Sequence, residues 1–225
     1  MIVQVFPSYE ALSHGAAQFI ANAIQAKPDL VLGLAAGNTP LGTYRQLVRM
    51  HREGAVDFSR VVFFSLDEYE GLDANDPRSF TSFLSQNLLD PLNVSPANVH
   101  LLKFQTVNFE GAILQAGGID LQILGIGRNG HIAFNEPGSS FNSRTRVVQL
   151  AEPAPEFAKT AITMGIATIL EARRILLLAS GASKAEVLAQ AIHGAISETL
   201  PASALQLHAD TTVMAEASSA VHLHP

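Results

Sequence analysis

A histidine and a glutamate, His131 and Glu136, follow a glycine-rich turn and stand five positions apart in the sequence. Imidazole has an unperturbed pKa close to neutrality, so it can accept or donate a proton at pH 7. A carboxylate that contacts one ring nitrogen fixes the tautomer and supports the protonated ring. The apolar residues at 121–124 are typical of a buried strand. The pattern predicts a proton-transfer site at the carboxyl end of a strand, with a purely structural histidine as the alternative.

The glycine-rich turn, Gly125-Ile-Gly-Arg-Asn-Gly130, also matches the spacing of a dinucleotide-binding fingerprint. That fingerprint requires a helix directly after its third glycine and an acidic residue about 20 positions further on. Here Pro137 ends any helix early, and the next acidic residue after Glu136 is Glu152. The context therefore argues against a dinucleotide cofactor.

Three further loops carry residues suited to an anionic sugar derivative. Gly37, Asn38 and Thr39 stand where a predicted helix begins, and the N-terminal N–H groups and dipole of a helix attract an anion. The alternative is a turn capped by Thr39. Asp67 ends an apolar strand, where burial raises a carboxyl pKa and suits a general base; the alternative is a helix cap or a solvated strand end. Lys184 follows a Gly-Ala-Ser turn and resembles the cationic tip of a phosphate site, although a surface lysine is the alternative. Together with the His–Glu pair, these loops indicate a phosphorylated sugar that undergoes proton transfer.

Apolar runs of strand length alternate along the chain with amphipathic stretches of helix length. Strands are predicted at residues 2–6, 30–34, 61–66, 119–124, 175–179 and 211–215, and helices at 8–25, 39–51, 79–89, 109–116, 158–171 and 184–193. The alternation predicts an α/β fold: a single domain, residues 1–225, with an open, mostly parallel sheet and helices on both faces, similar to a modified Rossmann fold. Ligands bind beyond the carboxyl ends of such strands. We therefore expect the four loops to form one site.

Composition limits the classes of partner. The 225 residues carry a net charge of −6, which argues against nucleic acid or an anionic membrane surface. The chain contains no cysteine, which rules out disulfides and thiolate metal sites. The N-terminus lacks a signal-peptide pattern, and no apolar run is long enough for a membrane helix. We expect a cytoplasmic protein without a metal.

Taken together, these motifs resemble those of the glucosamine-6-phosphate deaminase (isomerase) family. The resemblance covers residues 30–213 and rests most strongly on Leu32-Gly-Leu-Ala-Ala-Gly-Asn-Thr-Pro40, Ser65-Leu-Asp-Glu-Tyr-Glu-Gly-Leu72, Ser143-Arg-Thr-Arg-Val-Val148, Ser180-Gly-Ala-Ser-Lys-Ala-Glu186 and, as the most specific, His131-Ile-Ala-Phe-Asn-Glu-Pro-Gly138. It implies an enzyme that converts glucosamine 6-phosphate to fructose 6-phosphate and ammonia, without a cofactor or metal. A 6-phosphogluconolactonase-type hydrolase and a non-catalytic regulator that binds sugar phosphates remain the alternatives.

The resemblance also implies a role for each candidate residue. Asp67 would take the C2 proton of the open-chain sugar and return it at C1, while His131, held by Glu136, would carry protons for ring opening. Asn129 stands where the family often has an acidic residue, which weakens an acid role at that position. The phosphate would be held by Gly37, Asn38, Thr39 and Lys184.

Two departures from the family pattern affect these expectations. The segment between Val147 and Thr160 is about a dozen residues shorter than usual and lacks the arginine that binds the phosphate from a lid; Lys159 is a partial substitute. Pro153 and Pro155 mark this segment as a hinge or shortened loop. The chain also ends soon after the last predicted strand, so we expect a monomer or small homo-oligomer without activation by N-acetylglucosamine 6-phosphate.

Overall fold

The computed structural model describes residues 1–104, 106, 108–150 and 158–223. Its main sheet has seven strands, and every pairing between neighbours is parallel. In spatial order the strands are β1 (Ile2–Phe6), β10 (Thr211–Glu216), β9 (Ile175–Ala179), β6 (Leu121–Gly125), β2 (Val31–Leu34), β3 (Val62–Ser65) and β5 (Val99–His100). The predicted α/β fold with a mostly parallel sheet is confirmed, and the six predicted strands are present with bounds that differ by at most two residues.

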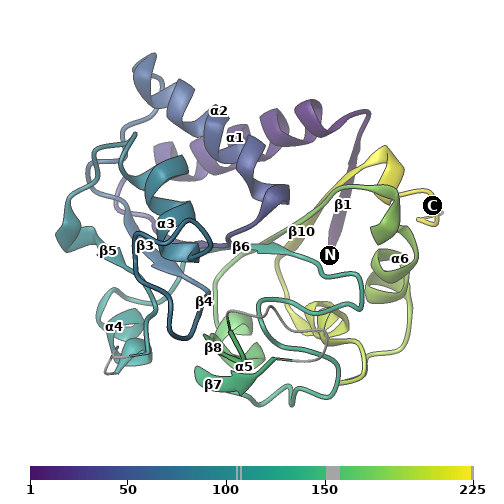
Figure 1. Cartoon of the computed structure of the whole chain (residues 1–225). Coiled ribbons are helices and arrows are strands. Elements are labelled where there is room, and N and C mark those ends of the chain that lie inside the picture. The colour runs from purple at the N-terminus through teal and green to yellow at the C-terminus, as the bar shows by residue number, and fades with distance from the viewer. Residues whose placement is uncertain (105, 107, 151–157, 224–225) are drawn as a thin grey trace.

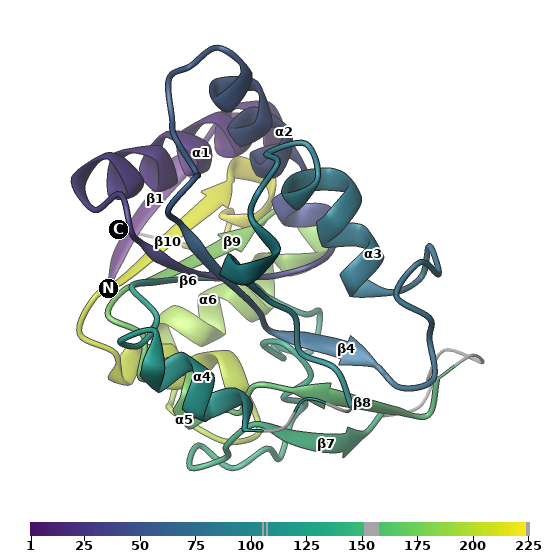
Figure 2. The same cartoon turned by 90° about the vertical axis from the view of Figure 1, so that its left-hand side faces the viewer.

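Helices cover both faces of this sheet (Figures 1 and 2). One face carries α1 (Tyr9–Ala26), α2 (Asn38–Arg52) and α3 (Phe80–Leu84), which continues as a π-helical turn over Ser85–Leu89; the other carries α4 (Phe109–Gln115), α5 (Ile166–Leu170) and α6 (Ala185–His193). Strands β2 and β9 are buried along their whole length because helices shield them on both sides. No helix in the described part of the chain is long and apolar enough to cross a membrane.

The order of the strands places a crevice between β2 and β6. After β2 the chain moves outward to β3 and β5, whereas after β6 it moves in the opposite direction to β9 and β10. Loops that leave neighbouring parallel strands toward opposite sides separate from each other, and open α/β sheets bind ligands at such a switch point. The two loops concerned follow Leu34 and Gly125, and both contain predicted site residues.

A second, three-stranded antiparallel sheet was not predicted. It consists of β4 (Asp67–Tyr69), β8 (Thr160–Thr163) and β7 (Arg146–Gln149), with β8 in the middle. The predicted helix at 158–171 is therefore wrong over its first half. β8 pairs with a strand on each side, so tertiary hydrogen bonds decide the conformation of an apolar segment whose pattern fits either element. Only α5 remains helical, and Pro153 and Pro155 lie outside the described residues.

A close approach at Gly165 separates β8 from α5. A Cβ atom on this glycine would lie 2.1 Å from the carbonyl oxygen of Ser143, so no other residue fits without a backbone shift. The Oγ of Ser143 accepts a hydrogen bond from Ile166 N at 3.0 Å, at the start of α5. This contact anchors the Ser-Arg-Thr-Arg segment, which leads into β7, to the start of α5.

Candidate active site

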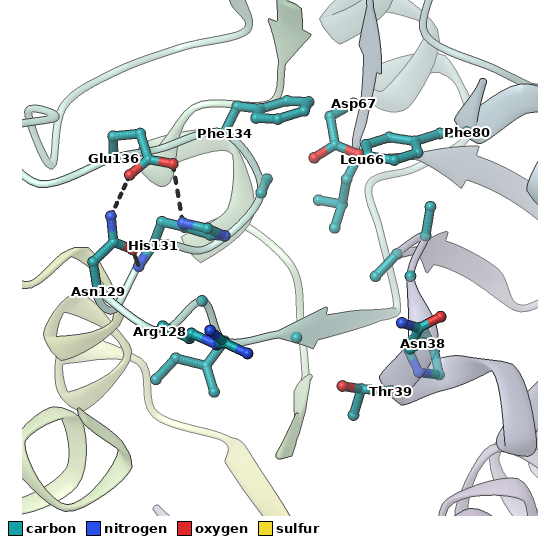
Figure 3. A pocket seen from close by; sticks show the side chains of 18 of the residues that line it. Asn38, Thr39, Leu66, Asp67, Phe80, Arg128, Asn129, His131, Phe134 and Glu136 are labelled. Atoms are coloured by element: carbon teal, nitrogen blue, oxygen red, sulfur yellow. Dashed lines mark hydrogen bonds and ion pairs between the residues drawn. The ribbon is translucent and has the colours of Figure 1, made fainter. Parts of the chain in front are cut away.

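A cavity of about 670 Å³ opens at the carboxyl ends of the strands, at the switch point between β2 and β6. Loops that follow β2, β3, β6 and β9 all contribute to its lining, as expected from their positions. The cavity gathers all eight predicted site residues: Gly37, Asn38, Thr39, Asp67, Asn129, His131, Glu136 and Lys184. Figure 3 shows Asp67 on one wall and the Asn129–His131–Glu136 group on the wall opposite.

Asp67 is the first residue of β4, and its side chain faces the cavity (Figure 3). The residue is 8% exposed, and its carboxylate accepts no hydrogen bond from any described residue. Burial raises the pKa of Asp67 to about 8, with a smaller contribution from the negative charge of Glu68. A carboxylate in this state is a strong base once ionised, because little in the protein stabilises its charge.

Glu68 is the neighbouring carboxylate, and its hydrogen bonds are structural. Its oxygens accept hydrogen bonds from Ser79 Oγ at 2.7 Å, Thr81 N at 2.8 Å and Phe80 N at 3.0 Å. They also accept one from Tyr69 N at 2.9 Å. Three of these donors stand at the start of α3, where a carboxylate satisfies N–H groups that lack partners within the helix. Glu68 therefore fixes α3 against β4.

On the opposite wall, Glu136 lies between His131 and Asn129 (Figure 3). Oε1 of Glu136 lies 3.0 Å from Nδ1 of His131, an ion-pair distance at which the ring N–H is not aligned as in a good hydrogen bond. Oε2 accepts a 2.6 Å hydrogen bond from Nδ2 of Asn129, and Oδ1 of Asn129 accepts one from the backbone N–H of His131 at 3.2 Å. Asn129 thus acts as a donor that orients the glutamate, which an ionised aspartate in its place would repel.

Burial lowers the pKa of His131, the negative charge of Glu136 raises it, and the positive charge of Lys184 lowers it. Because burial is the largest of the three effects, the ring is neutral at pH 7 and able to accept a proton. The ring packs directly over Gly127, where a Cβ atom would lie 2.4 Å from it. A side chain at Gly127, the second glycine of the turn, would clash with the histidine ring. The position of this glycine is therefore accounted for without a bound dinucleotide.

The N-terminus of α2 borders the cavity on the side of β2. Gly37 is the N-cap residue with φ of 122°, and no side chain caps the helix, so the alternative of Thr39 as a cap is not what the structure contains. Tyr9 braces this turn from α1: its Oη donates to the carbonyl of Asn38 at 2.7 Å and accepts from the N–H of Gly42 at 2.8 Å. An uncapped helix N-terminus next to a cavity is a favourable place for an anion.

Lys184 comes from the loop after β9 and is the residue before α6. The loop turns at Gly181, which has φ of 93°. Glu216 holds this turn by accepting hydrogen bonds from Ser180 Oγ at 2.6 Å and Gly181 N at 3.0 Å. Burial lowers the pKa of Lys184, and the nearby charge of Arg128 lowers it further. Within the described residues, no three His, Asp or Glu side chains form a group that could hold a metal ion.

Comparisons with known proteins agree with the geometry. The profile of a family described as glucosamine-6-phosphate isomerases/6-phosphogluconolactonase matches residues 8–214. The chain belongs to this family. It is 42% identical to a glucosamine-6-phosphate deaminase of Clostridioides difficile (strain 630), with 100% of this chain and 98% of that protein covered. It is 44% identical to glucosamine-6-phosphate deaminase 1 of Bacillus subtilis (strain 168), with 98% of both covered.

Solved structures of the isomerase/lactonase family divide into near and distant relatives. A monomeric glucosamine-6-phosphate deaminase superposes with a TM-score of 0.94 at 43% identity, covering 99% of this chain and all of the other. A 6-phosphogluconolactonase from Trypanosoma cruzi has a TM-score of 0.81 at 22% identity, covering 100% of this chain and 97% of the other, and shares the fold.

Sequence reasoning missed several residues of the cavity. Arg128 lines it, although the glycine turn that contains this residue was considered only for its glycines and its histidine. An aromatic cluster of Tyr69, Phe80 and Phe134 also lines it. The distance between ring centroids is 4.8 Å for Tyr69 and Phe80 and 5.1 Å for Tyr69 and Phe134. By contrast, Lys159, expected as a partial substitute for a lid arginine, is not among the described residues that line the cavity.

Proposed function

We propose that the protein is a glucosamine-6-phosphate deaminase that converts glucosamine 6-phosphate and water to fructose 6-phosphate and ammonia, as a step in the breakdown of amino sugars. One observation carries the proposal. In a member of the isomerase/lactonase family, Asp67 is a buried carboxylate without a hydrogen-bond partner among the described residues, and it faces His131 and Glu136 across the cavity. The names of the full-length relatives support the choice of substrate.

Asp67 is the base of the central step. In the open-chain sugar, the C2 hydrogen is acidified by the aldehyde at C1, so the ionised carboxylate removes it, and the C1 oxygen takes up a proton from solvent to give an enolamine. The protonated carboxyl returns the proton to C1, which becomes a hydroxymethyl carbon, and the amino nitrogen releases a proton to solvent as C2 becomes an imine. Water then adds to the imine, and ammonia leaves to give the ketone of fructose 6-phosphate. A base with a raised pKa suits both halves of this transfer.

His131 opens the sugar ring before this step. The neutral imidazole accepts the proton of the C1 hydroxyl and delivers a proton to the ring oxygen as the C1–O5 bond breaks. Glu136 stabilises the imidazolium in between, because its Oε1 lies 3.0 Å from Nδ1. Asn129 keeps the glutamate in place through its 2.6 Å hydrogen bond and is a positioning residue. We assign no acid or base role to its amide.

The phosphate binds at the end of the cavity where Gly37, Asn38 and Thr39 form the N-terminus of α2 and where Lys184 precedes α6. The helix N-terminus offers N–H groups and a positive dipole end, and Lys184 adds a full charge. We further propose that the protein works as a monomer in the cytoplasm. The monomeric state of the similar deaminase supports the first part.

Ammonia release from glucosamine 6-phosphate by the purified protein, assayed near pH 8 with a chelator present, tests the proposal. The assay is repeated in D₂O, where exchange of the Asp67 proton with solvent before its return leaves deuterium at C1 of the product. We expect ammonia and fructose 6-phosphate in equal amounts, with deuterium at C1 in the fraction of turnovers in which that exchange occurs. Ammonia release without fructose 6-phosphate would contradict the isomerising mechanism.

Two matched assays separate the alternatives. Hydrolysis of 6-phosphogluconolactone without ammonia release would place the chain with the lactonases, because ester hydrolysis needs no proton transfer from C2. Binding of glucosamine 6-phosphate without turnover of either compound would indicate a sugar-phosphate sensor. Both outcomes would overturn the proposed deaminase.

A further inference from the structure

Arg128 stands in the cavity without a partner. It belongs to the turn after β6, and Figure 3 shows its guanidinium reaching from that turn toward the side of the cavity that carries Asn38 and Thr39. The side chain forms no hydrogen bond or ion pair with any described residue. The glycines on either side hold the turn in place: His131 packs over Gly127, and Gly130 has φ of 83°.

Several arginines elsewhere in the described structure are paired with carboxylates, whereas the exposed Arg45 and Arg52 have no partner among the described residues. Arg144 forms ion pairs with Glu110 and Glu171, and Arg173 lies 3.1 Å from Asp120. A guanidinium offers five donors in a planar fork that matches carboxylate or phosphate, so such pairing is its usual state. Arg128 is also exposed, but unlike Arg45 and Arg52 it lines a cavity, so a ligand in that cavity is the partner its guanidinium is placed to bind.

Lys184 is a second cation in the same cavity, and its side chain also lacks a partner among the described residues. Burial lowers the pKa of Lys184, and the positive charge of Arg128, which lines the same cavity, lowers it further. Neither is neutralised by the carboxylate in its neighbourhood, because Glu136 is engaged by Asn129 and His131. Two converging cations cost folding energy unless a bound anion offsets their repulsion.

We propose that Arg128 is the second cationic arm of the phosphate subsite and that it sets the preference for a phosphorylated over a neutral amino sugar. Arg128 and Lys184 approach the phosphate from the β6 and β9 loops, and the N-terminus of α2 approaches it from the β2 loop. A guanidinium binds two phosphate oxygens at once, which the point charge of Lys184 cannot do. This assignment rests on the proposed function and adds to it a residue that binds substrate.

Steady-state kinetics of Arg128→Gln test the assignment. Loss of one charge-assisted contact predicts that KM for glucosamine 6-phosphate rises about 10–100-fold, with kcat within about threefold of the wild-type value. Competitive inhibition by inorganic phosphate weakens by a similar factor, and Arg128→Lys restores part of both losses. The matched control is Arg52→Gln, which removes the same charge at an exposed position in the last turn of α2, roughly 20 Å along the helix from Asn38.

Values of KM and of phosphate inhibition within twofold of wild type in Arg128→Gln would overturn the assignment. A fall in kcat with KM unchanged would overturn it too, because it would place Arg128 in the chemical step. Calorimetric titration of wild type and both Arg128 variants with inorganic phosphate gives the same comparison without turnover. Weaker phosphate binding in Arg128→Gln therefore supports the assignment even if the wild-type protein releases no ammonia, an outcome that would contradict only the proposed function.

Discussion

Asp67 and Glu68 are adjacent carboxylates at the end of the same apolar strand, and the protein treats them in opposite ways. Both are less than 10% exposed, at 8% and 6%. Glu68 points toward α3 and accepts four hydrogen bonds, whereas Asp67 points into the cavity and accepts none from the described residues. Burial therefore raises the pKa of Asp67 to about 8. Equal burial gives a structural anion in one case and a carboxylate with a raised pKa, suited to act as a base, in the other, and hydrogen bonding makes the difference.

The largest expected effect comes from removing the base. Asp67→Asn keeps the shape of the side chain and lacks a titratable group, so kcat for ammonia release should fall about 10²–10⁴-fold while substrate still binds. Asp90→Asn, which changes an exposed aspartate, is the control and should leave kcat unchanged. If the Asp67→Asn protein retained a tenth or more of the wild-type kcat, Asp67 would not be the base, and its functional difference from Glu68 would be contradicted.

The second prediction uses pH. Because the base must be ionised in the free enzyme, kcat/KM should rise about tenfold per pH unit below pH 8 and level off above it. A plateau that extends unchanged down to pH 6 would show that Asp67 is already ionised there.

Stability should respond to pH in the opposite sense. The unfolded chain releases the Asp67 proton near its ordinary pKa of 3.8, whereas the folded protein keeps it until about pH 8. The folded state binds more protons in this window, so the stabilisation is complete below pH 3.8 and is lost as pH rises through 8. The loss is at most about 1.4 kcal/mol per pH unit. Chemical denaturation of wild type and Asp67→Asn across pH 5–9 should show this slope only in the wild type.

Sequence reasoning located the loops of the site but not the directions of all their side chains. Apolar runs identify buried parallel strands, and the carboxyl ends of such strands meet at one edge, so the loops containing Asp67, His131 and Lys184 were expected to converge. Which of two adjacent carboxylates faces the cavity was suggested by family resemblance, because the second sheet that orients them was not foreseen. β4 has only three residues and β7 alternates in burial without a strong apolar signal.

Arg128 illustrates a different limit. The sequence pattern of the turn is set by its glycines and by His131. An arginine in a glycine-rich loop is equally typical of an exposed, solvated position. Its place at the wall of the cavity, near Lys184, distinguishes it from exposed arginines such as Arg52. Which side chains line a cavity is a tertiary property that local sequence does not encode.

The fourth prediction concerns Glu68. Replacement by Gln keeps one acceptor but places an NH₂ group against N–H and O–H donors at the start of α3, so the free energy of unfolding should fall by about 1–3 kcal/mol. Glu186→Gln, an exposed change on α6, is the control and should stay within about 0.5 kcal/mol of wild type. Urea denaturation at pH 7 measures both. A Glu68→Gln protein as stable as this control would mean that its hydrogen bonds contribute little.

The smallest expected effect connects the two carboxylates. The charge of Glu68 is the lesser of the two causes that raise the pKa of Asp67, after burial. Glu68→Gln removes that charge and leaves Asp67 buried, so the midpoint of the pH dependence of kcat/KM should move to lower pH by less than about one unit. The plateau value of kcat/KM should stay within a few-fold of wild type, because Glu68 does not line the cavity. A midpoint that moves to higher pH would mean that the ionised Glu68 stabilises the charged form of Asp67 through α3, and hydrogen bonding alone would then not separate the two residues.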